Sequence, residues 1–519
     1  MRHVMSAARL RRGVAAAVAV LALAGCGATV QLPPTTTTPG SAGAAEPGLS
    51  LSSPPAPAGP GNTTTGGVAT PGLSAGAGSG PSSGGGGATH APSGGAGTAS
   101  AAGAGPVRSV VRVGVIYIGG LAGATAALGG SAATTDSKSD YAAVFNYLNK
   151  HRGHGPKLTP YYFAINASSS QPAAVQLQSA CDHFTSDQRV DIVLTYTLDS
   201  GNVLSSCLAK KGTPLVDGYS EAGTGSATFA ANPNLWAPAQ ITFDRLGKLL
   251  PTYLIGARWA SSRWGNSCPT VRQPRIGVVT FDRPEYRAAY THDLVPTFKA
   301  LGDPVYDAVF LSVSGSSTQQ VAQVSAAVGS AVLKFSSECI DHVVMMSQVA
   351  VDYLFMDVAS SQGYSPRYGL SSLEAGPVLI PNLTNPRSQL RGAMGPGWSP
   401  YSDVLPANFD ALAKQPGARC LAILKHARLA PSDNNSAILA LPSCEGPFFV
   451  AAVVSHWRTS EPASALLGIV NSLGSSYHPV GAYASSFSSN QHDAAAAYRG
   501  FAFDDGCGCF RYTTGLRRM

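Results

Sequence analysis

The chain has 519 residues, a formal net charge of +7 and only 12% charged residues. Four of the positive charges are arginines among the first dozen residues, and one acid and one arginine in residues 27–108 cancel, which leaves +3 for the rest. So small a charge, with no basic cluster apart from Arg517 and Arg518, excludes the footprint of a nucleic-acid-binding protein. The 410 residues from Val110 onward are too many for one hydrophobic core and predict two lobes.

The first 26 residues have the order of a secretion signal. Arginines precede an apolar run from Val14 to Ala24, which is about half the roughly 20 residues that a membrane-spanning helix needs. The run ends in Leu-Ala-Gly-Cys at 23–26, and this quartet resembles the bacterial lipobox. The resemblance implies a signal peptide at 1–25 and a lipidated Cys26 that holds the chain on the extracytoplasmic face of the cell membrane. The alternative is an ordinary signal peptide followed by a chance cysteine. No second apolar run of about 18 residues is expected to span a membrane.

Residues 26–108 form the second predicted region, a linker of Gly, Pro, Ser, Thr and Ala with almost no large apolar side chain. Such a composition buries too little surface to offset its ordering entropy, so we expect disorder. The stretch 72–76 fits the hydrolase pattern G-x-S-x-G, but no expected strand precedes it and no expected helix follows it, which argues against a nucleophile elbow.

The region after residue 108 alternates short apolar strands with amphipathic helices. The strands expected first are 111–117, 158–164, 190–194 and 214–216, and the helices between and after them are 140–150, 172–184 and 201–210. A second series has strands at 275–279, 306–310 and 342–346 and helices at 243–254, 286–301, 321–335 and 349–362, with Pro251 expected to kink or shorten the first. Two βαβ series predict an α/β protein with two mostly parallel sheets.

The last part, from about 393, is richer in helix. Apolar stripes predict helices at 408–414, 418–427, 446–458 and 463–473, and the end from Tyr477 predicts short strands and turns. The full predicted division is lobe 1 at 109–240 and 393–476, and lobe 2 at 241–392 and 477–519.

The cysteine count agrees with export. Eight cysteines follow residue 108: Cys181, Cys207, Cys268, Cys339, Cys420, Cys444, Cys507 and Cys509. An even number in an oxidising compartment predicts four disulfides, for which the sequence alone allows 105 pairings. No paired C-x-x-C knuckle is present, so we expect no metal site and no cofactor.

In the order of its elements, the chain resembles the type 1 periplasmic binding proteins of the leucine/isoleucine/valine-binding kind. The stretches 191–201, 213–220 and 280–286 match a family strand with its ligand-facing loop. The resemblance implies two α/β lobes joined by a multi-strand hinge, with a ligand cleft between them. The chain departs from the pattern because the acid usual after the second strand is missing from 162–166, and because most of its cysteines are additional.

The resemblance also implies ligand-binding residues. Ser200 falls where the family binds a carboxylate, although a helix N-cap explains it as well. Tyr219 and Ser220 close the next strand. Tyr286 resembles an aromatic residue that lies over the ligand, with a core residue at a helix start as the alternative, and Glu374 falls near the family's ammonium-binding acid. Trp398 follows an expected crossover, and we expect it to pack at the hinge.

Disulfide pairs can be assigned within this frame. The spacing of Cys181 and Cys207 resembles that of a family disulfide. Cys268 and Cys339 each precede a strand of lobe 2, and adjacent parallel strands would bring them together. Cys420–Cys444 would join two helices, which leaves Cys507–Cys509.

These expectations describe a non-enzymatic lipoprotein that captures a small polar or amino-acid-like molecule, with an ABC-type permease as the expected partner. The alternative is a lipoprotein that uses the same fold to sense a ligand or contact a protein, because one fold serves both uses. No plausibly placed nucleophile–base pair or phosphate-binding loop argues for an enzyme.

Overall fold

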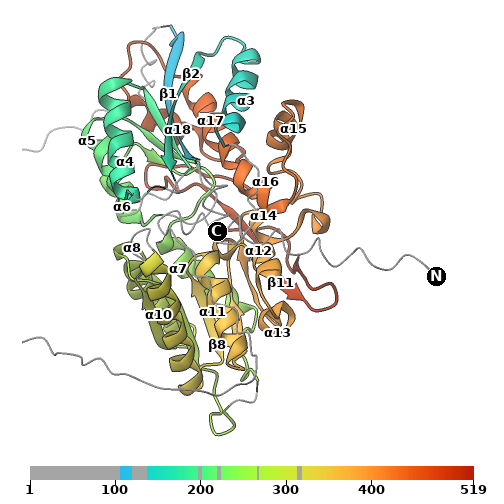
Figure 1. Ribbon diagram of the computed structural model, residues 1–519. Helices are drawn as coiled ribbons and strands as arrows, with labels where there is room; N and C mark the ends of the chain where they lie inside the picture. Colours follow the sequence, from blue (N-terminus) through green and yellow to red (C-terminus); the bar gives the residue numbers. More distant parts are fainter. Residues whose placement is uncertain are drawn as a thin grey trace, which may run out of the picture. The chain divides into compact units, whose positions relative to one another are not determined.

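The computed structural model describes residues 106–119, 137–166, 169, 171–196, 202–218, 224–265, 268–312 and 318–519. The predicted signal peptide, Cys26 and most of the predicted linker lie outside these residues. The described chain forms two α/β lobes, each built on its own sheet (Figure 1).

The first sheet contains five parallel strands in the order β2-β1-β3-β4-β5. Their bounds are β1 Val110–Gly119, β2 Lys157–Asn166, β3 Ile192–Thr195, β4 Leu215–Asp217 and β5 Leu235–Trp236. All but β5 were predicted, because each is a β-branched or aromatic run. β5 is only two residues long and leaves no periodicity to detect.

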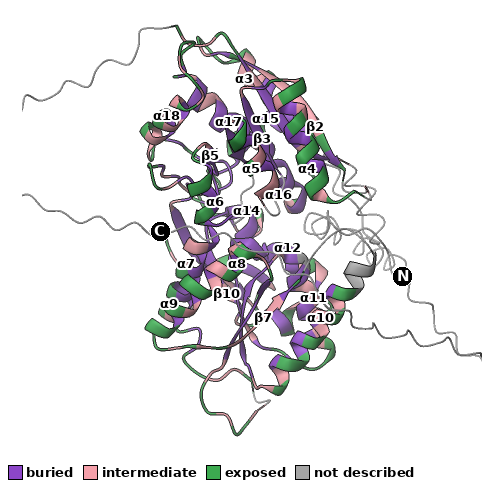
Figure 2. Cartoon of the chain, turned by 90° about the vertical axis from the view of Figure 1, so that its left-hand side faces the viewer, coloured by how far each residue is buried: buried purple, intermediate pink, exposed green. Residues whose placement is uncertain are grey.

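Helices cover both faces of this sheet. One core contains residues of α3 Ser137–Lys150, α17 Pro442–Val454 and α18 Ala465–Leu473, and the other contains residues of α4 Ala173–Asp182, α5 Val203–Lys210 and α6 Ser226–Ala231. Strands β1, β3, β4 and β5 are mostly buried and the edge strand β2 is mostly half-buried, whereas helices α4 and α5 have exposed outer faces (Figure 2). Lobe 1 is therefore completed by helices that follow lobe 2 in the sequence.

The second sheet has the order β12-β11-β10-β9-β8-β6-β7, with β13 paired to β11. Its strands are β6 Ile276–Phe281, β7 Val305–Leu311, β8 His342–Met346, β9 Arg367–Gly369, β10 Met394–Gly397, β11 Ala497–Asp504, β12 Cys509–Tyr512 and β13 Arg517–Arg518. Strands β6 to β10 pair with one another in parallel, and β11 runs antiparallel to its neighbours β10, β12 and β13. Because β10 pairs with β9 and β11, the lobe 2 sheet continues to Gly397, past the expected boundary at 392.

The helices of lobe 2 include α7 Phe243–Gly256, α8 Pro284–Ala289, α9 Val295–Ala300, α10 Thr318–Ser337, α11 Val349–Ser361, α12 Gly376–Asn382 and α13 Pro386–Leu390. Contrary to expectation, α7 continues past Pro251 to Gly256. Leu246, Leu250 and Leu254 on this helix are fully buried, so tertiary packing holds the helix across the missing hydrogen bond.

The connection back to lobe 1 contains α14 Pro400–Asp403, α15 Ala418–His426 and α16 Asn434–Ala440. The helix expected at 408–414 is wrong, because residues 409–417 are loop and turns. Asp410 there accepts a hydrogen bond from the Ala413 amide at 3.0 Å, a local bond that competes with helix, and Pro416 follows. Residues Asn434–Val454 are by length and composition apolar enough to span a membrane, contrary to expectation, but 89% of their 18-residue apolar window is buried inside the lobe, as in a core helix.

The first strands of the two lobes have an equivalent close contact. A Cβ atom added to Gly114 in β1 would lie 2.9 Å from the Phe184 ring, and one added to Gly277 in β6 would lie 2.9 Å from the Phe335 ring. Each glycine thus lets a covering aromatic side chain pack directly on the strand backbone.

The disulfides are Cys181–Cys207, Cys268–Cys339, Cys420–Cys444 and Cys507–Cys509, which confirms the four expected pairs. The first joins α4 to α5, and the third joins α15 to α17. Each bond closes a loop within one lobe and so stabilises that part of the fold. None of the four bonds links one lobe to the other.

Three segments connect the lobes: residues 237–242, 398–399 and 478–496. The first and third pair through backbone hydrogen bonds of Ala237 with His492 and Ala494, and of Gln240 with Ala495. The second and third meet where the Tyr483 amide donates to the Trp398 carbonyl at 3.3 Å. Trp398 is fully buried there, which confirms the expected packing role at the hinge.

A buried carboxyl group fixes the start of the third segment. Glu445 in α17 accepts hydrogen bonds from the Tyr477 hydroxyl at 2.6 Å and from the amides of Val480 and Gly481 at 2.6 and 2.8 Å. Burial raises the pKa of Glu445 to about 7, although these hydrogen bonds oppose the shift.

This shift predicts a pH-dependent term in stability. Between about pH 4.5 and 7 the unfolded chain loses the Glu445 proton while the folded chain keeps it, so the stabilising contribution is complete below 4.5 and is lost as the pH rises through 7. A pKa shift from 4.5 to about 7 corresponds to a loss of about 3 kcal/mol in the free energy of unfolding. Denaturant unfolding of wild type and Glu445→Gln across pH 4–8 measures it. The free-energy difference between the two should decline with pH, and a flat difference would contradict the assignment.

Candidate functional site

The site predicted from the sequence lies where parallel strands end. In open α/β sheets, ligands bind outside the carboxyl ends of the strands. In lobe 2 these ends include Phe281 of β6, Met346 of β8 and Gly369 of β9. The described side chains that follow them are mostly polar, and they include both sequence-predicted residues that the structure describes, Tyr286 and Glu374.

The carboxyl edges of the two lobes meet at one described place. The Phe243 amide at the start of α7 donates to the Thr224 carbonyl, in the loop after β4, at 3.0 Å. A Cβ atom added to Gly225 in the same loop would lie 3.4 Å from the Cβ of Glu285 in α8. The loop after β4 of lobe 1 therefore packs against the first helices of lobe 2.

Glu374 lies in a short 3₁₀ turn, Ser372–Glu374, immediately after β9. Its Oε2 atom accepts hydrogen bonds from the amide of Ser371 at 2.5 Å and from the Ser371 hydroxyl at 2.8 Å, and this hydroxyl also accepts from the Leu373 amide. This reciprocal arrangement is a capping box. Oε1 of Glu374 is buried and has no hydrogen-bond partner among the described residues, so the turn uses only one oxygen of this carboxyl group.

A second buried acid lies near Glu374. Asp352, in the first turn of α11, accepts a hydrogen bond from Ser347, which directly follows β8. Both carboxyl groups are fully buried. Burial, followed by the charge of Asp352, raises the pKa of Glu374 well above its usual range. A cation placed here would offset both effects. The sequence analysis missed Asp352, for which the only signal was a polar Ser347 at the end of a buried strand.

Tyr286 lies in the first turn of α8 and is 2% exposed. Its ring lies 3.9 Å from that of Phe243 and 5.2 Å, edge to face, from that of Phe281, measured between centroids. Burial raises the pKa of its hydroxyl. The ring is therefore a packed residue that joins α7, α8 and β6, as the core interpretation of Tyr286 expects. The charges of Glu374 and Asp352 also act on its hydroxyl, which places it near the two acids.

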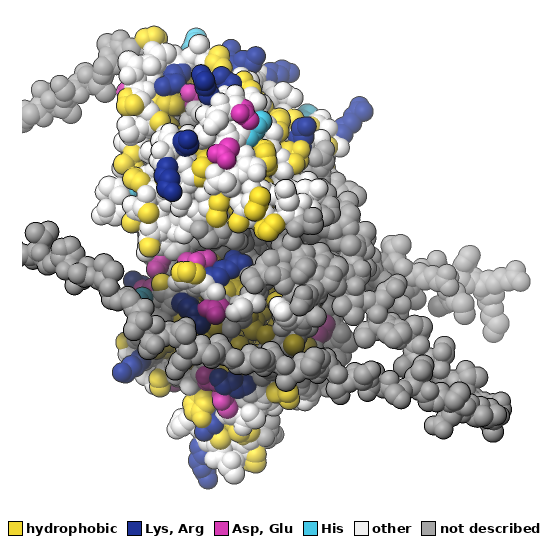
Figure 3. All heavy atoms as spheres, turned by 60° about the vertical axis from the view of Figure 1, so that its left-hand side comes forward, with side chains coloured by type: hydrophobic (Ala, Val, Ile, Leu, Met, Phe, Trp, Pro, Cys, Tyr) yellow, Lys and Arg dark blue, Asp and Glu magenta, His cyan; other side chains and the backbone are white. Residues whose placement is uncertain are grey.

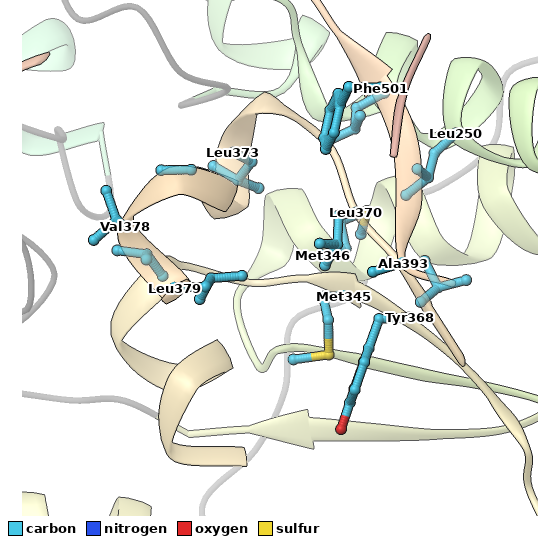
Figure 4. Packing of buried hydrophobic residues seen from close by; sticks show 14 of the residues in the cluster. Leu250, Met345, Met346, Tyr368, Leu370, Leu373, Val378, Leu379, Ala393 and Phe501 are labelled. Atoms are coloured by element: carbon cyan, nitrogen blue, oxygen red, sulfur yellow. The ribbon is translucent and has the colours of Figure 1, made fainter. Parts of the chain in front are cut away.

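The apolar side of this edge is closely packed. Figure 4 shows the side chains of Leu370, Leu373, Met346 and Phe501 gathered in one cluster, and all four are buried. Leu373 precedes Glu374 in the turn, so its packing in this cluster holds the turn against the hydrophobic core.

The predicted residues of lobe 1 lie outside the described part of the chain: Ser200, Tyr219 and Ser220. The described residues of this edge include Tyr141 of α3 and Tyr162 of β2, whose hydroxyls are buried and have no hydrogen-bond partner there. Asp217, the last residue of β4, is within electrostatic range of Tyr141. Tyr141 is fully buried near the start of α3.

A separate pocket of about 600 Å³ lies beside the hinge. It is lined by α6, the first turns of α7 and residues 489–493 of the third connecting segment, and its side chains include Phe229, Arg245 and His492. Neither Tyr286 nor Glu374, the two sequence-predicted ligand residues in the described part of the chain, lines it.

The surface agrees with the charge analysis. On the face drawn in Figure 3, Lys and Arg side chains lie among acidic, apolar and neutral ones on both lobes. One group of possible metal ligands lies together in the described chain, Cys181, Asp182 and Cys207. Its two sulfur atoms are bonded to each other and offer no thiolate.

Comparison with known proteins places this geometry in a class. No family profile matches the chain, and no curated protein matches its sequence. Among solved structures, a possible leucine/isoleucine/valine-binding protein from Rhodopirellula baltica is 13% identical with a TM-score of 0.53, and covers 80% of this chain and 98% of its own. A branched-chain amino acid ABC transporter protein from Thermus thermophilus with bound valine is 14% identical, with a TM-score of 0.55 and coverage of 80% and 97%. A solute-binding protein from Rhodopseudomonas palustris in complex with p-hydroxybenzoic acid is 11% identical, with a TM-score of 0.53 and coverage of 79% and 97%.

This chain therefore has the two-lobed type 1 periplasmic-binding fold, as predicted. Structures similar to it are substrate-binding proteins of ABC transporters, and they hold different ligands in the same fold.

The packing of Tyr286 predicts a structural effect. Tyr286→Ala should lower the free energy of unfolding by about 3–5 kcal/mol, because it leaves a cavity between Phe243 and Phe281. Chemical denaturation measures this, with Tyr306→Ala as the control. Tyr306 is 52% exposed, and its loss should cost under about 1 kcal/mol. Equal effects of the two substitutions would contradict the core role.

Proposed function

We propose that this protein is an extracytoplasmic solute-binding lipoprotein. It captures a small polar or amino-acid-like molecule between its lobes and delivers it to an ABC-type importer. The fold supports a solute-binding role. The buried acids at the carboxyl ends of the lobe 2 strands support a polar or amino-acid-like ligand.

Glu374 is the observation that carries the proposal. A buried carboxyl group is costly when it is charged and unpaired, and a ligand ammonium group removes that cost by supplying both a positive charge and hydrogen-bond donors. Oε1 of Glu374 is buried and without a partner in the described chain, and Asp352 adds a second negative charge beside it. A ligand with a primary amine fits this pair.

The other end of the ligand would be held by lobe 1. Ser200, Tyr219 and Ser220 follow the carboxyl ends of β3 and β4 in the sequence and supply hydroxyl groups suited to a carboxylate. Closure of the lobes about the three connecting segments would then separate the ligand from water. Tyr286 would stabilise the site as a packed core residue of lobe 2 and would not contact the ligand with its whole ring.

Ligand binding is testable with the full chain in mild detergent. We expect valine, leucine or a related amino acid to raise the melting temperature, with about 2.7 kcal/mol of stabilisation at a hundredfold excess over Kd. Glu374→Gln should weaken amino-acid binding about tenfold to a hundredfold, because a charged hydrogen bond is lost. Glutamine also forms a capping box, so the turn should persist. p-Hydroxybenzoate, which has no ammonium group, is the control ligand. No shift with any amino acid would contradict the amino-acid-like ligand.

The anchor is testable separately. Cys26→Ser removes the thiol that would carry the lipid, so the protein should move from the membrane fraction to the soluble extracytoplasmic fraction. Metabolic labelling with a fatty-acid analogue should mark the wild type and not the variant. If both forms stay in the membrane fraction, another segment anchors the chain. Ligand binding without an associated permease would favour the sensing role.

A further inference from the structure

Ser372 forms hydrogen bonds that reach beyond its own turn. Its hydroxyl donates to Oδ1 of Asp403 at 2.6 Å and accepts from the amides of Trp398 and Ser399 at 2.8 and 3.1 Å. Trp398 and Ser399 form the second connecting segment between the lobes. One buried hydroxyl therefore joins the turn of Glu374 to the backbone of the hinge.

Asp403 extends the link to the end of the chain. Its Oδ2 atom accepts a hydrogen bond from the Tyr512 hydroxyl at 3.3 Å, and Tyr512 ends β12, after the third connecting segment. The Arg499 guanidinium lies over the Tyr512 ring, 3.9 Å from its centroid. The second connecting segment, the turn of Glu374 and strand β12 thus meet around one hydroxyl–carboxyl pair.

The surrounding backbone is closely packed at two glycines of β10. A Cβ atom on Gly397 would lie 2.2 Å from the Asp403 carboxyl group, and one on Gly395 would lie 1.5 Å from the Leu370 carbonyl. Ser371, Ser372 and Asp403 are fully buried. A movement of the second connecting segment must therefore displace the turn, or break the hydrogen bonds of Ser372.

We infer that Ser372 and Asp403 are positioning residues that couple the place of the Glu374 carboxyl group to the angle of the hinge. The carboxyl group would then reach its binding position only in one arrangement of the lobes. The role of Glu374 as the ligand's partner rests on the proposed function, whereas the mechanical coupling exists without a ligand.

Ser372→Ala in the full chain tests the coupling without a ligand. Three hydrogen bonds are lost, so amide hydrogen exchange at Leu373 and Glu374, and at Trp398 and Ser399, should accelerate roughly tenfold to a hundredfold. Spin labels at exposed Lys150 in lobe 1 and Lys299 in lobe 2 should report a broader distance distribution. Ser372→Thr keeps the hydroxyl and should restore both measurements. Ser361→Ala, an exposed serine that bonds only within α11, should change neither.

Tyr512→Phe is a milder second variant, because it removes a single link to Asp403. It should accelerate exchange at Leu373 and Glu374 about twofold to tenfold, although Tyr512 bonds to Asp403 and not to the turn. The inference is overturned if Ser372→Ala lowers only the melting temperature while the interlobe distances keep their wild-type distribution. It is also overturned if Tyr512→Phe leaves the exchange of the turn unchanged. Failure of every amino acid to bind the wild type would refute the proposed function and leave these measurements valid.

Discussion

The position of the two lobes depends on one buried carboxylate, Asp493. Its Oδ2 atom accepts from the Thr242 amide at 2.7 Å and from the Arg245 guanidinium at 2.8 Å, and Arg245 also donates to the carbonyls of Asp493 and Ala495. Thr242 caps α7, the first helix of lobe 2. The first and third connecting segments therefore enter lobe 2 as one unit. Removing one partner of such a buried pair leaves the other uncompensated, which is far more costly than losing a surface ion pair.

This constraint explains why the connecting segments matter more to the fold than their length suggests. The chain leaves lobe 1 after β5, returns after β10 and leaves again after α18, so neither lobe is complete until the third passage. Glu445 holds the start of that passage, Asp493 holds its end, and the Tyr483 amide ties it to Trp398 in between. The lobes thus turn about segments that are hydrogen-bonded to one another. No disulfide crosses between the lobes in the described chain, so these connections depend on hydrogen bonds and packing.

Local sequence predicted the strands and helices of both βαβ series, because buried parallel strands are apolar runs and their helices carry apolar stripes. Prediction from local sequence failed for elements whose structure depends on tertiary contacts. β5, β9 and β10 have two to four residues each, and β10 reads Met-Gly-Pro-Gly, which has no strand propensity. The helix expected at 408–414 does not form, because the Asp410 side chain accepts a local hydrogen bond from the Ala413 amide that competes with helix. The pairing of Cys268 with Cys339 was predictable because adjacent parallel strands bring them together, whereas the pairing of Cys181 with Cys207 followed from the family resemblance.

The site was harder to predict than the fold, since the same residue types serve binding and packing. Sequence position placed Tyr286 and Glu374 after the correct strands, yet it left open whether each faces a ligand or the core. Tyr286 is enclosed by two phenylalanine rings. Asp352 comes from α11, more than 20 residues before Glu374, and only the pairing of β8 with β9 brings the two elements together.

Glu374 illustrates why one residue can satisfy both interpretations. A carboxyl group has two oxygens, and Oε2 is fully occupied by the amide and hydroxyl of Ser371. This bonding fixes the direction of the carboxyl group relative to its own turn before any ligand arrives, which lowers the entropy cost of binding. Oε1 then stands in a fixed position with its hydrogen-bonding capacity unused in the described chain. The capping box is therefore the means by which the fold orients this acid, and the structural role of Glu374 supports its proposed binding role.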